Sequence, residues 1–197
     1  MKYLSIDLEA TGLDENCQII EFAMVPFDTK LKRLEESLAR SVYIHCPSFE
    51  DLRDSLDPWV REHNEKIIRK SHSEGLMMSE FIDFLKKYLE SSEVRSYFGN
   101  QKIVLFGKSM TAIDLPFLNR DLGWEFMRKY FHHRNLDLSC IGYSLIDLGF
   151  LPLGMDSGSN LMNYLNMGDV SHTALEDAKN TAIMYLKLLD KFELKKE

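Results

Sequence analysis

The sequence predicts an α/β domain built on a mixed β-sheet, and three observations support this prediction. Apolar segments with the length and composition of β-strands dominate the first part of the chain. In the second part, helical periodicity takes over and alternates with short strand-like segments. The length of 197 residues and the hydrophobic fraction of 45% favour one domain, 1–197, with a substantial core.

The predicted strands are short apolar runs bounded by polar or turn-forming residues. The first ends before the turn at 11–14, and the run KIVLF at 102–106 is apolar throughout, as expected for a buried strand. The first three strands are expected to form an antiparallel meander. The five predicted strands are 2–8, 18–27, 38–45, 102–106 and 135–138.

The predicted helices follow the spacing of apolar residues along one face. Ser79 is expected to cap one of them. The remainder of 47–75 reads as polar and irregular, and 151–171, rich in Gly, Asn, Ser and Met, reads as a loop or lid. The predicted helices cover 59–68, 80–89, 113–122, 124–132, 139–149 and 174–191.

Charge and cysteine content restrict the classes of partner. The formal net charge of −7 disfavours a protein that wraps long nucleic acid, so a nucleic-acid substrate would be short. Cys17, Cys46 and Cys140 lie far apart, and neither a disulfide framework nor a structural zinc site is expected. Because no apolar run resembles a signal peptide or a membrane span, we expect a cytoplasmic protein with no membrane contact.

Two carboxylates stand at the end of the first predicted strand. Asp7 and Glu9 are two residues apart, so strand alternation places both side chains on one face. Neighbouring buried carboxylates repel each other unless a cation lies between them. Oxygen ligands of this kind suit Mg²⁺ or Mn²⁺. The alternative is a solvated or capping pair without a metal.

A second candidate group precedes the last predicted helix. Thr173 and Glu176 have capping-box spacing, which predicts Thr173 as the N-cap. Asp177 then lies in the first helical turn, where the helix dipole favours its charge. His172 lies just before the helix and could act as a general base. In isolation, His172 and Asp177 could equally be a polar loop residue and a helix-start acid.

Asp114 occupies the junction between a predicted strand and a predicted helix. The strand ends near Gly107, and Pro116 is tolerated in the first turn of the helix. Such junctions commonly carry functional groups in α/β sheets. An isolated Asp at a helix start is usually a cap, so Asp114 becomes a site candidate through its combination with the other groups.

The three groups occur in the order found in a known enzyme family. D-x-E-x-T-G at 7–12, the Asp that opens a mid-chain helix, and H-x-A-x-x-D at 172–177 resemble the motifs of the DEDDh exonucleases. Within that family the chain is most similar to the oligoribonucleases. The similar segments are IDLEATGL at 6–13, QIIEFA at 18–23, DPWVREH at 57–63, FHHRNLDLS at 131–139 and the closing helix.

This resemblance implies a ribonuclease-H-like fold, in which three antiparallel strands are followed by parallel ones. It implies metal ligation by Asp7, Glu9, Asp114 and Asp177, and removal of a proton from the attacking water by His172. Two Mg²⁺ or Mn²⁺ ions, typically about 4 Å apart, would activate that water and stabilise the leaving oxygen. The implied products are nucleoside 5′-monophosphates released from the 3′ end.

The resemblance also implies contacts with the terminal bases of the substrate. Leu13 and Trp59 correspond to residues that sandwich these bases, and aromatic stacking is worth roughly 1–3 kcal/mol per base. His63 lies close to Trp59 in the sequence and is a further candidate. Trp59 could alternatively be a core aromatic.

A third set of residues corresponds to a cap over the 5′ phosphate of the substrate. Ser109 and Arg134 match the family pattern. His133 stands where a tyrosine is usual, and Lys108 replaces a usual asparagine, although both could still contact a phosphate. In oligoribonucleases part of this cap comes from the partner subunit, so the resemblance implies a homodimer.

The substrate class that these observations favour is short single-stranded oligonucleotides down to dinucleotides, RNA favoured and DNA possible. The two departures from the family pattern keep other interpretations open. One is an exonuclease of the proofreading or maturation type that acts on short DNA or on longer single strands. The other is a relative that binds nucleotides or metals without catalysis.

Overall fold

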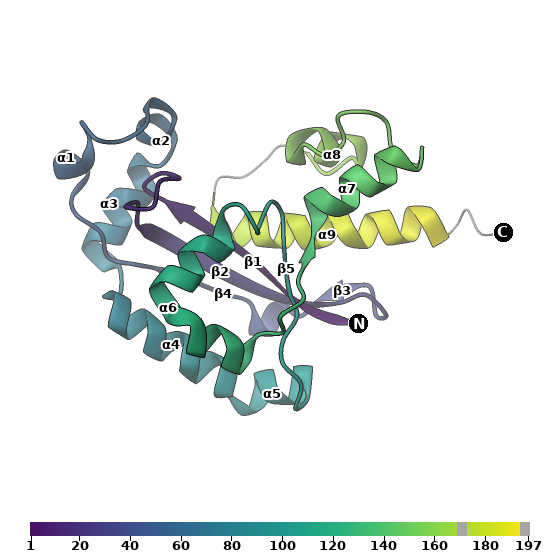
Figure 1. The fold of residues 1–197 in the computed structure, drawn as a ribbon, viewed down its shortest axis with the longest axis horizontal. Helices are drawn as coiled ribbons and strands as arrows, with labels where there is room; N and C mark the ends of the chain where they lie inside the picture. The colour runs from purple at the N-terminus through teal and green to yellow at the C-terminus, as the bar shows by residue number, and fades with distance from the viewer. Residues whose placement is uncertain (169–172, 194–197) are drawn as a thin grey trace.

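The antiparallel half of the sheet contains four strands. The computed structural model describes residues 1–168 and 173–193 (Figure 1). In it, β1 (Lys2–Ala10) pairs antiparallel with β2 (Ile19–Asp28). β2 also pairs antiparallel with β3 (Arg33–Leu34) and β4 (Arg40–Tyr43). β3 was not predicted, and β4 is shorter than the predicted strand because a 3-10 turn, Glu36–Leu38, precedes it.

The parallel half of the sheet is added on the other side of β1. β5 (Leu105–Gly107) runs parallel to β1, and β6 (Leu136–Asp137) runs parallel to β5. Ile103 makes only an isolated bridge, to Phe131, so β5 begins later than predicted. The strand order is β3-β2-β1-β5-β6 with β4 beside β2, which confirms the predicted mixed α/β sheet.

One face of the sheet packs against α4 (Met78–Glu90), α5 (Ser92–Phe98) and α6 (Asp114–Tyr130). Even-numbered side chains of β1, including Leu4 and Ile6, point into this layer. These residues form the larger part of the core.

The opposite face packs against α7 (Leu138–Asp147), α8 (Gly158–Tyr164) and α9 (Ala174–Glu193) (Figure 1). Odd-numbered side chains of β1 and β2 face this layer; Tyr3 and Phe27, for example, belong to its apolar cluster. Strand alternation therefore directs Asp7 and Glu9 towards α9.

A group of short helices covers one end of the sheet. They are α1 (Phe49–Leu52), α2 (Pro58–His63) and α3 (Glu65–Glu74), which pack around the buried Ile20. The helix predicted at 59–68 is present as α2 and the first part of α3, whereas the prediction that the rest of 47–75 is irregular was wrong. Two of these helices are too short for the apolar periodicity to show more than one turn.

One helix start differs from the prediction, and one predicted helix break is present. Met78 is the first residue of α4, and the backbone N–H of Met77 donates to Glu80 Oε2 at 2.8 Å, so Ser79 is not the cap. The two helices predicted on either side of Gly123 are confirmed as the two parts of α6, which is interrupted by a kink where Gly123 has a non-helical φ of 77°.

The predicted loop at 151–171 contains α8 and extends into 169–172, which lies outside the described residues. In the described part of the chain, the structure contains no helix with the length and apolar content of a membrane span.

Candidate active site

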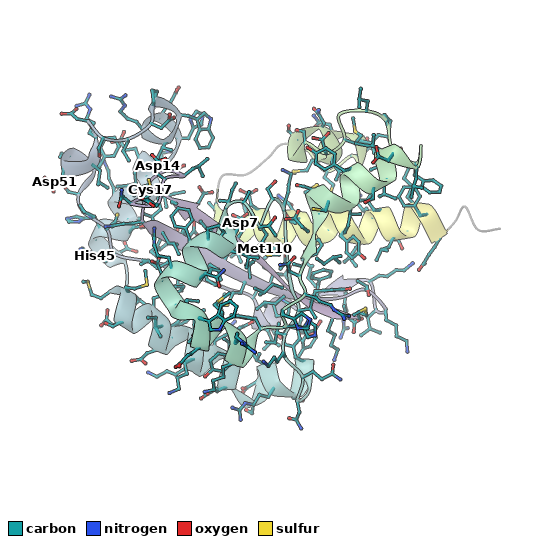
Figure 2. The ribbon with its side chains drawn as sticks, viewed as in Figure 1. Asp7, Asp14, Cys17, His45, Asp51 and Met110 are labelled. Atoms are coloured by element: carbon teal, nitrogen blue, oxygen red, sulfur yellow. The ribbon has the colours of Figure 1, made fainter. Side chains whose placement is uncertain are left out.

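Three carboxylates meet between the sheet and α9. One ligand oxygen from each of Asp7, Glu9 and Asp177 lies within 4.8 Å of the other two. Figure 2 shows Asp7 where β1, α6 and α9 come together. The structure therefore brings together two predicted groups that are 168 residues apart in the sequence, and their geometry can hold a metal ion.

The start of α9 positions Asp177. Thr173 Oγ1 accepts from the backbone N–H of Glu176 at 3.4 Å, and the Asp177 N–H donates to the Thr173 carbonyl at 3.0 Å. Both contacts agree with the predicted N-cap. One turn later, Ser5 Oγ on β1 donates to the Ala178 carbonyl at 2.7 Å. This bond fastens the first turns of α9 to the strand that carries Asp7 and Glu9.

Asp114 is the first residue of α6 and is only 4% exposed. It lies near the cluster, since its charge makes the largest contribution after burial to the raised pKa of Asp7. It is not among the three residues that lie within the 4.8 Å limit. This geometry suits a carboxylate that contributes directly or through water.

Burial raises the pKa of all four carboxyl groups, and mutual repulsion adds to the rise. Burial raises the pKa of Glu9, Asp114 and Asp177 to about 7 in each case. Burial, followed by the charges of Asp114 and Asp177, raises the pKa of Asp7 well above its ordinary value. The ionised cluster consequently requires a positive partner near neutral pH.

The described side chains do not supply that partner. Among the described residues, 1–168 and 173–193, no Lys or Arg forms an ion pair with any of the four carboxylates. Oxygen-only donors without a protein cation match the preference of Mg²⁺ and Mn²⁺. The chemistry of the donor set thus fits a divalent ion at this position.

Sequence reasoning missed two residues that contact the cluster or its scaffold. Asn64, between α2 and α3, is 3% exposed and donates from Nδ2 to Glu9 Oε2 at 3.2 Å. Glu21 on β2 is 2% exposed and lies directly across from Glu9 in the strand register. A charged residue inside the apolar run IIEFAMVPF was the sequence signal for Glu21, whereas nothing local distinguishes Asn64.

A hollow of about 570 Å³ adjoins Glu9. Leu13 and Trp59 both line it and are 75% and 51% exposed, so Trp59 is not a core aromatic. The ring of His63 stacks on that of Trp59, with 4.4 Å between their centroids. The hollow thus combines apolar lining residues with a carboxylate of the cluster, as a terminal nucleotide would need.

Ser109 is held in an unusual backbone conformation beside Asp137. Its φ is 55°, a left-handed value that is rare for a residue other than glycine. The Ser109 N–H donates to Asp137 Oδ1 at 3.0 Å, and 3.0 Å separates its hydroxyl from that of Ser139. Asp137 Oδ1 also accepts from the Ser139 N–H at 2.9 Å. These bonds fix the direction of the Ser109 hydroxyl.

The other predicted cap residues lie at two different places in the fold. His133 and Arg134 are exposed and come just before the first residue of β6. Asp7, by contrast, lies in the second half of β1, which runs in the same direction as β5 and β6. The Lys108 side chain lies against Gly158 at the start of α8, 3.0 Å from the position that a Cβ would take there. His172 lies outside the described residues.

Comparison with known proteins identifies the family of this chain. The family model described as an exonuclease matches residues 4–185. The chain belongs to the exonuclease family. The matched range includes Asp7, Glu9 and Asp177, the three clustered carboxylates.

The sequence relatives of this exonuclease include bacterial oligoribonucleases. The oligoribonuclease of Legionella pneumophila (strain Corby) is 30% identical over 183 residues, which cover 89% of this chain and 84% of the relative. That of Ralstonia nicotianae is 32% identical over 143 residues, 69% of this chain and 58% of the relative's length.

Solved structures show the same fold at low sequence identity. The nuclease domain of 3′hExo, a DEDDh family member bound to rAMP, superposes with a TM-score of 0.69 at 17% identity and covers 96% of this chain and 92% of that one. Cell-death related nuclease 4 superposes with a TM-score of 0.68 at 14% identity, over 96% and 64% of the two chains. Together, the family and the fold make this chain a hydrolase of the 3′→5′ exonuclease class.

Proposed function

We propose that this exonuclease shortens single-stranded oligonucleotides a few residues long, down to dinucleotides, and releases nucleoside 5′-monophosphates. One observation carries the proposal: Glu9, a member of the carboxylate cluster, also lines the hollow that Leu13 and Trp59 line. The cluster suits phosphodiester hydrolysis, and the hollow suits the terminal base of a strand.

Asp7, Glu9, Asp114 and Asp177 would hold two Mg²⁺ or Mn²⁺ ions. When bound, such ions activate a water molecule and stabilise charge on the leaving 3′-oxygen. The protein's own contribution is to hold four carboxylates at fixed positions on three elements, β1, α6 and α9. Asp7 belongs to the close group with Glu9 and Asp177, and its pKa is also raised by the charge of Asp114; this contact with all three groups supports a bridging role for it.

His172 is the proposed general base, because it stands two residues before the start of α9 in the H-x-A-x-x-D motif. An imidazole has the pKa range to take a proton from water near neutral pH. Asp177, five residues later, would supply the fixed ligand beside it.

Leu13 and Trp59 would hold the terminal bases between them. Both side chains are exposed at the hollow, where a flat base can displace water from an apolar surface. Thr11 and Asn64 also line the hollow and offer polar groups near the sugar. His63, stacked on Trp59, would extend the aromatic surface.

Ser109 and Lys108 would contact the 5′ phosphate of a short strand, with His133 and Arg134 supplied by the partner in a homodimer. The exposure of His133 and Arg134, and their distance along the sheet from Asp7, support delivery from a second subunit. A closed cap of this kind excludes long strands, in agreement with the net charge of −7. The free thiols of Cys17, Cys46 and Cys140 are compatible with a cytoplasmic setting.

The test is product release from 5′-labelled 2-, 3-, 5- and 20-mers of RNA and DNA, each with Mg²⁺ or Mn²⁺. Fast cleavage confined to the shortest RNAs supports the proposal. Preference for short DNA would keep the chemistry and overturn the sugar assignment. Faster attack on the 20-mers would overturn the cap, and nucleotide binding without cleavage would overturn catalysis.

A further inference from the structure

Glu21 is a buried carboxylate that the proposed chemistry does not use. It is 2% exposed, and its neighbours along β2 are buried and apolar. It also lies opposite Glu9 in the antiparallel register, an arrangement of like charges that destabilises a sheet. A carboxylate kept in such a position needs compensating contacts.

Both carboxylate oxygens of Glu21 have partners from other elements. Ser41 Oγ on β4 donates to Oε1 at 2.6 Å, and the backbone N–H of Ala174 donates to Oε2 at 3.2 Å. Ala174 is the first residue of α9, and the N–H groups of a first helical turn have no partner within their own helix. Glu21 therefore acts as a remote cap for α9, and its negative charge also complements the helix dipole.

The position of this cap matters because Asp177 lies one helical turn beyond Ala174. The apolar side chains that hold this turn on the sheet are small: Ala174 and Ala178 pack against Ala23 and Val25. Small contacts of this kind leave the helix start free to shift unless polar bonds fix it. Among the described residues, such bonds run from Ala174 to Glu21 in the first turn and, further along, from Ser5 to Ala178 and from Lys179 to Glu36.

We propose that Glu21 is a positioning residue that anchors the first turn of α9 and thereby sets the distance of Asp177 from Asp7 and Glu9. The inference rests on the proposed function, because it assumes that Asp177 binds a metal ion. The anchoring of α9 by Glu21 can be tested without any cleavage. Outer groups that orient metal ligands typically change metal affinity by about 10–100-fold when they are removed.

Two substitutions separate hydrogen bonding from charge and size. In Glu21→Gln, the amide oxygen can accept from Ala174 and the amide NH₂ can donate to Ser41, so both bonds persist without the charge. Glu21→Met keeps a similar length and loses both bonds. The matched control is Asp28→Leu, because Asp28 is a buried acid at the opposite end of the same strand, where it accepts from the Lys30 and Leu31 N–H groups.

The first measurement is Mn²⁺ binding without substrate, followed by the electron paramagnetic resonance signal of free Mn²⁺. We expect Glu21→Met to raise the dissociation constant at least tenfold, Glu21→Gln by less than threefold, and Asp28→Leu not at all. Wild-type affinity in Glu21→Met, or equal losses in the Gln and Met variants, would overturn the proposal.

The second measurement is hydrogen exchange in the segment 173–180 without metal. Faster exchange in Glu21→Met and wild-type exchange in Glu21→Gln are expected, whereas no change in Glu21→Met would contradict the anchor. If Glu21→Met does not fold, Ser41→Ala takes its place, because it removes one of the two bonds at a half-buried site. It should weaken Mn²⁺ binding and speed hydrogen exchange by smaller amounts. Unchanged values of both would then overturn the proposal. A wild-type protein that binds Mn²⁺ and cleaves nothing would defeat the proposed function alone.

Discussion

The Asn64 amide donates a hydrogen bond to the Glu9 carboxylate, with 3.2 Å between Nδ2 and Oε2. Burial raises the pKa of Glu9 to about 7, and this bond opposes the rise because it favours the charged form. Asn64 also approaches the Ala10 carbonyl at 3.4 Å, so the amide is held by the strand that carries Glu9. A group 55 residues away in the sequence thus orients a proposed metal ligand.

Replacement of Asn64 by alanine should weaken metal activation. Without the amide, Glu9 loses its orienting donor and its pKa rises further, so less of the ionised ligand is present at pH 7. We expect the Mn²⁺ concentration for half-maximal cleavage to rise about tenfold or more, and the onset of activity to move to higher pH. Asn119→Ala, at an exposed position on α6, serves as the control. Unchanged metal activation in Asn64→Ala would contradict the positioning role.

The protein should gain metal-dependent stability as the pH rises. Burial raises the pKa of Glu9 and Asp177 to about 7, so between about pH 4 and pH 7 the native state binds more protons than the unfolded chain. Without metal, the contribution of these groups to stability therefore falls across that window. Mn²⁺ binds the ionised form, and its stabilising effect should grow over the same range.

Thermal unfolding measures this dependence. With Mn²⁺ at a hundredfold excess over its Kd, we expect Tm to rise by roughly 5–10 °C at pH 8 and to change little at pH 5. Asp7→Asn should abolish the shift and raise the stability of the metal-free protein at pH 8, because it removes a buried repulsion. Asp83→Asn, an exposed acid on α4, should behave as wild type. An equal Mn²⁺ shift at both pH values would contradict the carboxylate assignment.

Trp59 should contribute to substrate affinity more than to stability, since it is 51% exposed. Loss of a stacking surface worth roughly 1–3 kcal/mol predicts that Trp59→Ala raises KM for a dinucleotide about tenfold or more. Trp124→Ala removes a tryptophan that is 67% exposed outside this hollow and should leave KM unchanged. Equal effects of the two substitutions would show that the hollow is not the base site.

Subunit mixing tests whether the phosphate cap crosses a dimer interface. Asp7→Asn removes catalysis but leaves Arg134, and Arg134→Ala removes the cap but leaves the carboxylates. If Arg134 acts on the partner's site, mixed dimers regain one complete site, and the mixture should exceed the sum of its separate activities on a dinucleotide. No gain on mixing, or a monomer in light scattering, would contradict delivery from the partner.

Much of the fold was predictable because its elements are locally encoded. The long strands β1 and β2 and the helix α9 have apolar patterns long enough to read, and the predicted N-cap Thr173 accepts the expected bond from Glu176. Two-residue strands such as β3 and single-turn helices such as α1 carry too few residues for any periodicity.

The carboxylates of the site were predictable from the sequence, whereas the residues that support them were not. Asp7, Glu9 and Asp177 lie in motifs whose spacing places them on strand ends and helix starts. Asn64 and Glu21 act through bonds to elements 55 and 153 residues away, and no local pattern specifies such partners. Their roles depend on tertiary packing, which brings α3 and α9 against the same strand, β2.

The most direct test of the central claim follows the products of a 5′-labelled RNA 5-mer with wild type and Asp7→Asn. Wild type should shorten the label-bearing strand one nucleotide at a time from the 3′ end, only with Mg²⁺ or Mn²⁺. Asp7→Asn should lose about a hundredfold to a thousandfold in rate, as removal of a group that acts on the transition state does. Full activity in Asp7→Asn, or internal fragments from the wild type, would contradict a metal-dependent 3′→5′ exonuclease centred on these carboxylates.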